Sequence, residues 1–189
     1  MARTAAPNTR QRVLETAAEL FYARGVRGVG MQEIIDTVGI GKNLLYREFP
    51  TKADLVQAYL EQNREIWDRY ANAASPGPDA DAAAQLAALV QAMANHVHDR
   101  LYRGCPFRNY LAEFGDEGDP GRELSLAYLR DTRARIDALA AQHRPGDPGL
   151  AERIWVIVEG LYGAAGHPDS ARIVDAAACL AKEIIDSHV

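Results

Sequence analysis

Apolar residues recur every three or four positions through most of the chain, a spacing that predicts helices rather than strands. Interruptions by glycine and proline divide the pattern into about nine segments. The expected helices cover approximately residues 8–25, 31–38, 40–49, 52–73, 79–101, a short stretch within 103–121, 119–142, 147–165 and 170–188. The predicted fold class is therefore all-α.

The two short segments between Met31 and Phe49 are predicted to form a pair of helices joined at a glycine. Met31, Ile34, Ile35 and Val38 lie at positions i, i+3, i+4 and i+7, so they share one apolar helical face. Gly39 follows this face, and a glycine just past a helix can adopt the left-handed conformation that ends it. Pro50 ends the second helix.

The outward face of the second short helix carries polar side chains. Asn43 and Arg47 point away from the apolar Leu45, which is typical of the helix that a helix-turn-helix inserts into the major groove of DNA. Arginine can pair with guanine and asparagine with adenine, whereas a leucine can touch the methyl group of thymine. On spacing alone, an ordinary helical hairpin with a solvated polar face remains the alternative.

Residues 9–59 closely resemble the DNA-binding domain of the tetracycline-repressor (TetR) family of bacterial regulators. The segments that carry the resemblance are AAELFYARG, VGIGKNLLYREF and FPTKADL. It implies an all-helical homodimer that binds a palindromic operator on double-stranded DNA. It also implies a DNA-binding domain over residues 1–52 and a larger ligand-binding and dimerisation domain over residues 53–189.

The resemblance also implies roles for individual residues. It places Lys42, Tyr46 and Lys52 on the DNA backbone, and Asn43, Leu44 and Arg47 on base edges. The chain departs from the family at Gly30 and Gly41, where a hydroxyl residue is common, and at Glu48, where histidine is common. A carboxylate at this position is repelled by phosphates unless it pairs with Lys52 or accepts a hydrogen bond from a cytosine amine. We favour the ion pair between Glu48 and Lys52.

Two pairs of residues on either side of this region have the spacing of a helix cap. Asn8 with Gln11, and Thr51 with Asp54, lie three residues apart and can cap helices reciprocally. Lys52 at the second of these helix starts is a candidate phosphate clamp. The helix that begins there is long enough to link the two domains.

The charge is distributed unevenly along the chain. The net charge is −5, but residues 1–52 carry +3 and the remaining residues −8. A basic face on the first part can therefore meet phosphates. Arg3 and Arg10 can extend it as a flexible arm; the alternative is a solvated tail, which we favour for Arg3. No stretch reaches the ~18 uninterrupted apolar residues of a membrane span, and the N-terminal residues lack the apolar core of a secretion signal. These features predict a cytoplasmic protein without a membrane partner.

The segment around Gly104, Cys105 and Pro106 resembles "GCP" segments in one group of TetR-family effector domains, and is where we expect a small organic effector. The ligand-binding candidates are Trp67, Tyr70, His96, Tyr102, Cys105, Phe107, Arg108, Asn109, Tyr128, Trp155, Tyr162 and His167. For each aromatic residue the alternative is a place in the hydrophobic core.

The last two predicted helices are strongly apolar and rich in small residues. In the family, such helices pair across a two-fold axis, which the palindromy of an operator requires. The predicted dimer interface consists of Ile157, Leu161, Ala164, Ile173, Ala177, Leu180 and Ile184. Packing within one subunit is the alternative.

Other chemistry receives little support from the sequence. Cys105 and Cys179 lack redox spacing, and His96 and His98 are two residues apart on a helix, so they do not share a metal. A small helical enzyme using His96, Cys105 or Glu113 lacks a nucleophile, base and orienting group at related spacings. We predict no metal, no cofactor and no enzyme activity. A family member that acts without a small molecule is the remaining alternative.

Overall fold

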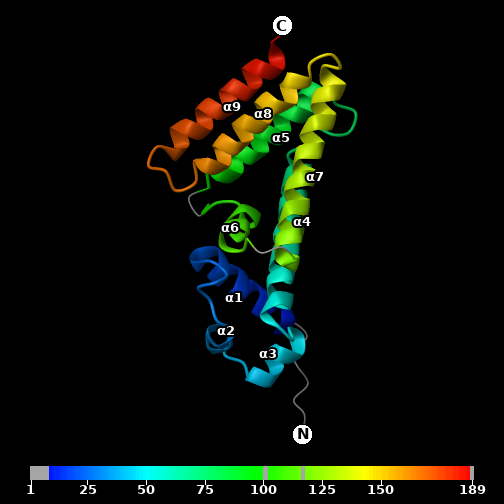
Figure 1. Ribbon diagram of the computed structural model, residues 1–189. Coiled ribbons are helices and arrows are strands. Elements are labelled where there is room, and N and C mark those ends of the chain that lie inside the picture. Colours follow the sequence, from blue (N-terminus) through cyan, green and yellow to red (C-terminus); the bar gives the residue numbers. More distant parts are fainter. Residues whose placement is uncertain (1–8, 100–101, 116–117, 188–189) are drawn as a thin grey trace. The chain divides into compact units, whose positions relative to one another are not determined.

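The computed structural model describes residues 9–99, 102–115 and 118–187, and within them the chain forms nine α-helices (Figure 1). The helices are α1 (Thr9–Arg24), α2 (Met31–Val38), α3 (Lys42–Glu48), α4 (Lys52–Ala73), α5 (Ala82–Val97), α6 (Pro106–Glu113), α7 (Pro120–His143), α8 (Pro148–Gly163) and α9 (Ser170–Asp186). This confirms the predicted all-α class. Most bounds lie within a few residues of the expected ones.

Two compact units divide the chain, and neither is continuous in sequence. Unit 1 comprises Met1–Arg64 and Pro106–Ala127, and unit 2 comprises Glu65–Cys105 and Tyr128–Val189. This division differs from the expected boundary at residue 52, because α6 and the start of α7 belong with the helix-turn-helix. Helices α4 and α7 each have residues in both units.

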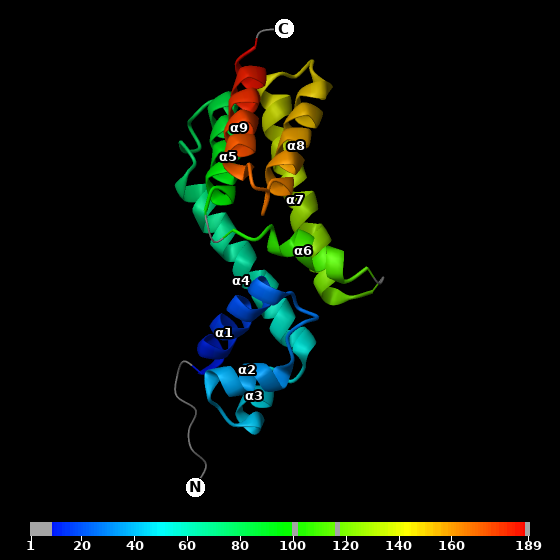
Figure 2. The same cartoon turned by 90° about the vertical axis from the view of Figure 1, so that its left-hand side faces the viewer.

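Unit 1 is built on the mutual packing of α1, α2 and α3 (Figure 2). Ile34 from α2, Leu45 from α3 and Leu55 from α4 are fully buried. The ring of Phe21 meets that of Tyr59 edge to face, with 5.5 Å between their centroids. The apolar faces expected from the sequence therefore form one core.

The predicted helix ends of unit 1 are largely as expected. Gly39 ends α2 in the left-handed conformation, with φ 71° and ψ 42°. The backbone N–H of Thr51 donates to Asp54 Oδ2 at 2.8 Å, and that of Asp54 donates to Thr51 Oγ1 at 3.1 Å, which confirms the capping box. The predicted partner of Gln11, Asn8, lies outside the described residues, as does Arg3; Gln11 itself donates to Glu15.

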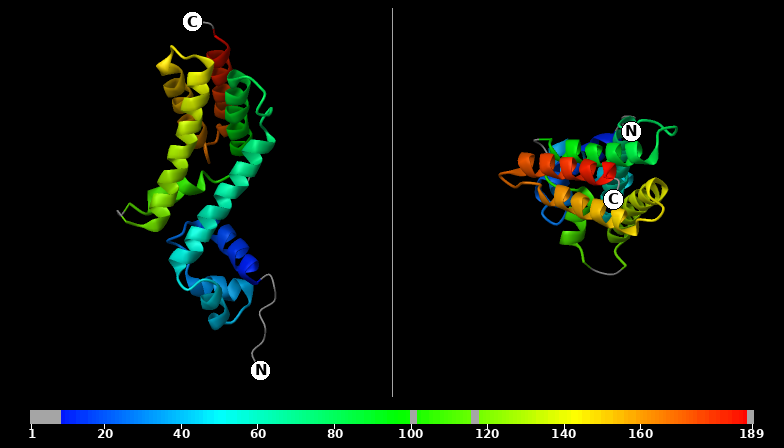
Figure 3. Two further views of the ribbon diagram at one scale, coloured as in Figure 1. Left: turned by 90° about the vertical axis from the view of Figure 1, so that its right-hand side faces the viewer. Right: turned by 90° about the horizontal axis from the view of Figure 1, so that it is seen from above.

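Unit 2 contains α5, α8 and α9 packed against one another, as the view from above in Figure 3 shows. Leu86, Ile154, Leu161 and Val174 are among its buried side chains. Several large apolar side chains of the unit remain exposed: Val156 on α8 is 68% exposed, and Leu180 on α9 and Ile66 on α4 are each 47% exposed. The unit therefore has an apolar core and, in the single chain, an additional uncovered apolar surface.

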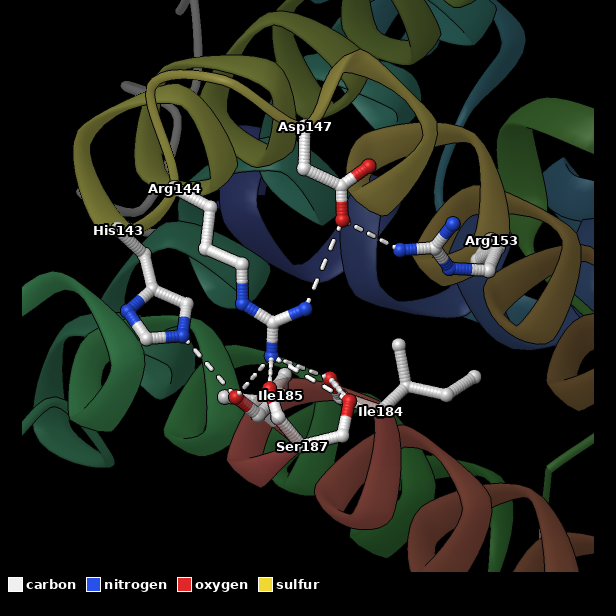
Figure 4. A network of polar contacts seen from close by, with 7 residues as sticks. All are labelled: His143, Arg144, Asp147, Arg153, Ile184, Ile185 and Ser187. Carbon is white, nitrogen blue, oxygen red and sulfur yellow. Dashed lines mark hydrogen bonds and ion pairs between the residues drawn. The ribbon is translucent and has the colours of Figure 1, made fainter. Parts of the chain in front are cut away.

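The C-terminal end of α9 is held by side chains from the connection between α7 and α8 (Figure 4). Arg144 Nη2 donates to the carbonyl oxygens of Ile184 at 2.8 Å and Ile185 at 2.7 Å, and also to that of Ser187. His143 Nε2 donates to the Ile185 carbonyl at 3.0 Å. The last carbonyls of a helix lack partners within it and favour positive charge, so this cluster stabilises α9.

Replacing Arg144 with alanine is expected to lower the free energy of unfolding of unit 2 by about 1–2 kcal/mol, because several carbonyls lose a charged donor. Both tryptophans, Trp67 and Trp155, lie in unit 2, so urea unfolding followed by tryptophan fluorescence measures the change. Arg153→Ala is the matched control. Arg153 also pairs with Asp147, but its side chain is 47% exposed, compared with 15% for Arg144. An equal loss in both variants would contradict the capping role.

Candidate nucleic-acid interface

The outward face of α3 consists mainly of exposed polar side chains, and its opposite face is buried in unit 1. Leu45 is fully buried and anchors the helix, whereas Lys42, Asn43, Tyr46 and Arg47 are exposed and Leu44 is half-buried. The ammonium of Lys42 lies 5.8 Å from the centre of the Tyr46 ring. The structure therefore brings five of the six predicted DNA-binding residues together on one short helix.

The predicted ion pair between Glu48 and Lys52 is wrong. Glu48 instead pairs with Arg47, whose Nη2 lies 2.9 Å from Glu48 Oε1. Arg47 and Glu48 are the last two residues of α3, and their side chains meet there although residues adjacent on a helix usually point apart.

Lys52, the sixth predicted DNA-binding residue, is half-buried and engaged within unit 1. Its Nζ donates to the backbone carbonyl of Val26 at 2.6 Å. Burial lowers the pKa of Lys52, and the negative charge of Glu113 partly opposes this shift. A bond to the protein's own backbone restrains the side chain, so Lys52 contributes to the packing of unit 1.

Two arginines from α1 hold the helix-turn-helix. Arg10 Nη1 donates to the carbonyl of Glu48 at 2.7 Å, at the C-terminal end of α3. The same guanidinium lies 4.2 Å from the centre of the buried Phe49 ring. Arg12 Nη2 donates to the carbonyl of Val38, at the end of α2, at 3.0 Å. Both positive groups meet helix C-termini, which is the favourable end for a cation.

Glu113, the last residue of α6, binds the turn between α1 and α2. Its two carboxylate oxygens accept the backbone N–H of Val26 at 3.1 Å and of Arg27 at 2.7 Å. The sequence indicated Glu113 only as a weak enzyme candidate, and no local pattern connects it to a turn more than 80 residues away. The helix-turn-helix is therefore supported by a segment outside the N-terminal domain that the sequence predicted.

Four of the predicted effector residues form a cluster of rings in unit 2. The His96 ring centre lies 5.7 Å from that of Trp67, 5.9 Å from that of Tyr70 and 5.0 Å from that of Tyr102. Burial lowers the pKa of His96, although Asp99 opposes the shift, so the neutral imidazole is favoured. Such a cluster presents flat apolar surfaces with polar edges.

The other predicted effector residues are distributed over both units. Cys105, Tyr128 and Tyr162 are buried in unit 2, and burial raises the pKa of Tyr128 far above its usual range. Phe107, Arg108 and Asn109 lie on α6 in unit 1. Trp155 lies beneath the guanidinium of Arg133, whereas His167 is exposed and accepts the backbone N–H of Asp169.

Two surface grooves in the described part of the chain include none of these candidates. One lies between α5 and α9, and its lining includes Ala87, Ala88, Ala178 and Ala181; the other lies at the α7–α8 connection.

The predicted dimer residues divide into two groups. Ile157, Leu161 and Ala164 are buried in the core of unit 2, so their side chains do not face a second subunit unless unit 2 rearranges. On α9, Ile173, Ala177 and Ile184 are half-buried and Leu180 is exposed. The exposed stripe on α8 comprises Val156, Gly160 and Gly163 instead, three positions that share one helical face.

Among the described residues, none of the helices combines the length and the apolar character that crossing a lipid bilayer would require.

A helix-turn-helix whose second helix exposes lysine, asparagine, tyrosine and arginine, carried by an all-α chain, defines a DNA-binding transcriptional regulator. Residues 13–59 match the family model described as bacterial regulatory proteins of the tetR family. The chain belongs to the TetR family of transcriptional regulators, a family of regulators rather than enzymes.

Individual relatives agree with this assignment. The chain is 27% identical over 172 residues to the probable transcriptional regulator ArpR of Pseudomonas putida, covering 84% of this chain and 80% of that protein. It is 25% identical over 130 residues to an uncharacterised helix-turn-helix regulator of Lactococcus lactis, covering 68% of this chain and 66% of that protein.

A solved structure of a TetR-family regulator from Streptomyces coelicolor covers 93% of both chains with a TM-score of 0.86 and 27% identity. Another, from Chloroflexus aurantiacus, has a TM-score of 0.79 and 25% identity, and covers 95% of this chain and 96% of that one. The similarity therefore extends over the helical body as well as the helix-turn-helix.

Proposed function

We propose that the protein is a cytoplasmic repressor that binds a palindromic operator as a homodimer and releases it when a small organic effector binds. The observation that supports this most strongly is the outward face of α3. Lys42, Asn43 and Arg47 are exposed on this face, and Leu45 on the opposite side is buried and anchors the helix. Lys42 and Tyr46 suit phosphate oxygens, and Asn43 and Arg47 suit base edges.

Dimerisation is proposed through the exposed apolar stripe of α8 and α9. Val156 and Leu180 are large apolar side chains in contact with water, and Gly160 and Gly163 leave the α8 surface flat enough for a second helix to approach. A two-fold dimer presents one α3 to each half of a palindrome.

The ring cluster of Trp67, Tyr70, His96 and Tyr102 supports a flat or apolar organic effector. Trp67 and Tyr70 lie on α4, and the same continuous helix begins at Lys52 in unit 1. An effector that favours one conformation of α4 thereby alters DNA affinity, provided that it binds the two states with different affinity. A regulator that acts without any small molecule is the competing possibility.

The direct test is binding of the purified protein to the DNA upstream of its own gene, followed by fluorescence anisotropy at low and moderate salt. Tight, salt-sensitive binding to a palindrome with two subunits, or a multiple of two, per site is expected. If unrelated DNA competes equally well, selection from a random duplex pool follows. Failure to enrich any sequence there would disprove sequence-specific binding.

Lys42→Ala and Arg47→Ala are expected to weaken DNA binding in different ways. Lys42→Ala removes a phosphate contact, so it lowers the slope of log K against log salt by about one per bound subunit and weakens binding to all sequences. Arg47→Ala weakens operator binding selectively, by roughly 1–3 kcal/mol per half-site. Lys182→Ala is the control, because Lys182 is an exposed lysine on α9 that pairs with Asp186. An unchanged slope for Lys42→Ala would remove Lys42 from the phosphate contacts.

A further inference from the structure

The side chain of Arg47 is held from one side by its neighbour in the chain. Both Nε, at 3.3 Å, and Nη2, at 2.9 Å, donate to the same oxygen, Oε1 of Glu48. The guanidinium therefore meets the carboxylate side-on. Because the guanidinium is planar and rigid, a contact through one of its edges fixes the direction in which its other N–H donors point.

The edge that remains open is the one that matches guanine. A guanidinium has five N–H donors. Two of them are directed at Glu48, so three remain, and all of these are on Nη1 and Nη2. The edge between Nη1 and Nη2 offers two parallel donors, which is the geometry that pairs with O6 and N7 of a guanine in the major groove.

Glu48 is the better fixed of the two residues. Its side chain is 21% exposed, whereas that of Arg47 is 54% exposed. Its backbone carbonyl accepts the bond from Arg10, and the same Arg10 guanidinium packs on the buried ring of Phe49. The less exposed Glu48 carboxylate thus limits the directions in which the more exposed Arg47 side chain can point.

We propose that Glu48 is a positioning residue for base recognition, which holds Arg47 in the orientation that reads a guanine and away from neighbouring phosphates. The inference rests on α3 contacting bases as proposed above. The carboxylate also repels the DNA backbone, so it lowers affinity for every duplex while it raises the difference between correct and incorrect sequences. Glu48 therefore exchanges affinity for specificity.

The experiment uses the full chain and its variants Arg47→Ala, Glu48→Ala and Glu48→Gln. Selection of the wild-type protein from a random duplex pool defines the preferred sequence. Fluorescence anisotropy then compares that duplex with duplexes altered at single base pairs. The control is Asp36→Ala on α2, which removes an exposed carboxylate of the same helix-turn-helix whose described partner is Gln32 rather than an arginine.

We expect Arg47→Ala to lose the preference for one G·C pair in each half-site. Glu48→Ala lowers the preference for that same pair by roughly tenfold, within the range that separates a bidentate contact from a mismatched one. It also tightens binding to unrelated DNA. Glu48→Gln retains an oxygen acceptor and retains most of the preference, which identifies orientation as the cause. In an Arg47→Ala background, Glu48→Ala leaves the preference unchanged.

The proposal is overturned if Glu48→Ala changes binding to all duplexes by one common factor, as Asp36→Ala is expected to do. It is also overturned if the pair affected by Arg47→Ala is not G·C. Thermal melting by circular dichroism establishes that each variant is folded, and Glu48→Gln gives a second reading if Glu48→Ala is unstable. A wild-type protein that enriches no sequence would instead disprove the proposed operator binding itself, and this inference with it.

Discussion

A Val156→Asp variant is expected to be a monomer and to bind the operator at least about 100-fold more weakly than the wild-type protein. Val156 is 68% exposed in the single chain, and a carboxylate placed there would be buried without a partner in a dimer formed through α8 and α9. Two linked half-site contacts gain roughly 100-fold or more in avidity over one, and this gain is lost with the dimer.

The measurement combines size-exclusion chromatography with light scattering and anisotropy on the operator duplex. Asn95→Asp is the matched control, because Asn95 is an exposed residue of α5, and an aspartate there adds the same charge and keeps the oxygen that accepts from Gln91. The control should remain a dimer with normal affinity. A Val156→Asp protein that stays dimeric would move the interface away from the exposed stripe of α8.

The second large effect is expected from Glu113→Ala, which should lower the free energy of unfolding of unit 1 by about 2–3 kcal/mol. The backbone N–H groups of Val26 and Arg27 both lose a charged acceptor, and hydrogen bonds to charged groups contribute about 1.5–3 kcal/mol. Glu113→Gln keeps one acceptor oxygen and should lose about half as much. Amide hydrogen exchange in a peptide that contains Val26 and Arg27 measures the change where it occurs.

Two further variants make this test specific. Glu123→Ala removes a carboxylate of α7 that is 56% exposed, and it should leave exchange at the turn unchanged. Gly25 has φ 79°, and a Cβ added there would lie 2.7 Å from Glu113 Oε1. Gly25→Ala should therefore be less harmful in a Glu113→Ala background than in the wild type. If the effects of Gly25→Ala and Glu113→Ala on the free energy of unfolding simply add, the Glu113 carboxylate does not contact the turn at Gly25.

The sequence predicted the features whose causes are local. The end of α2 at Gly39 and the capping box of Thr51 and Asp54 depend on residues at most four apart, and both are present in the structure. Leu45 is buried and Arg47 exposed, as the helical spacing indicated. Helical periodicity and capping are properties of short segments, so a single sequence carries them.

The features that the sequence did not predict are contacts for which a charged side chain has more than one possible partner. Glu48 has cations at Arg47 and Lys52 within reach, and spacing does not decide between them. Lys52 instead bonds the carbonyl of Val26, 26 residues earlier, and no pattern marks that contact.

The dimer residues illustrate a related difficulty. Helix α8 is apolar on more than one face, so the sequence does not reveal which face meets the core. Ile157 is 7% exposed, whereas its neighbour Val156 is 68% exposed. Only the packing of α8 against α5 and α9 separates the two positions.

The bond from Glu113 to the α1–α2 turn restricts how operator specificity can be exchanged between relatives. Residues 1–64 form a continuous segment, but the backbone amides of Val26 and Arg27 take their acceptor from residue 113. A chimera that transplants only the N-terminal segment pairs this turn with whatever side chain the host protein carries at the end of its own α6. A graft that keeps this contact therefore contains two pieces of chain, the N-terminal segment and the segment that carries α6, so the two must change together in the course of divergence.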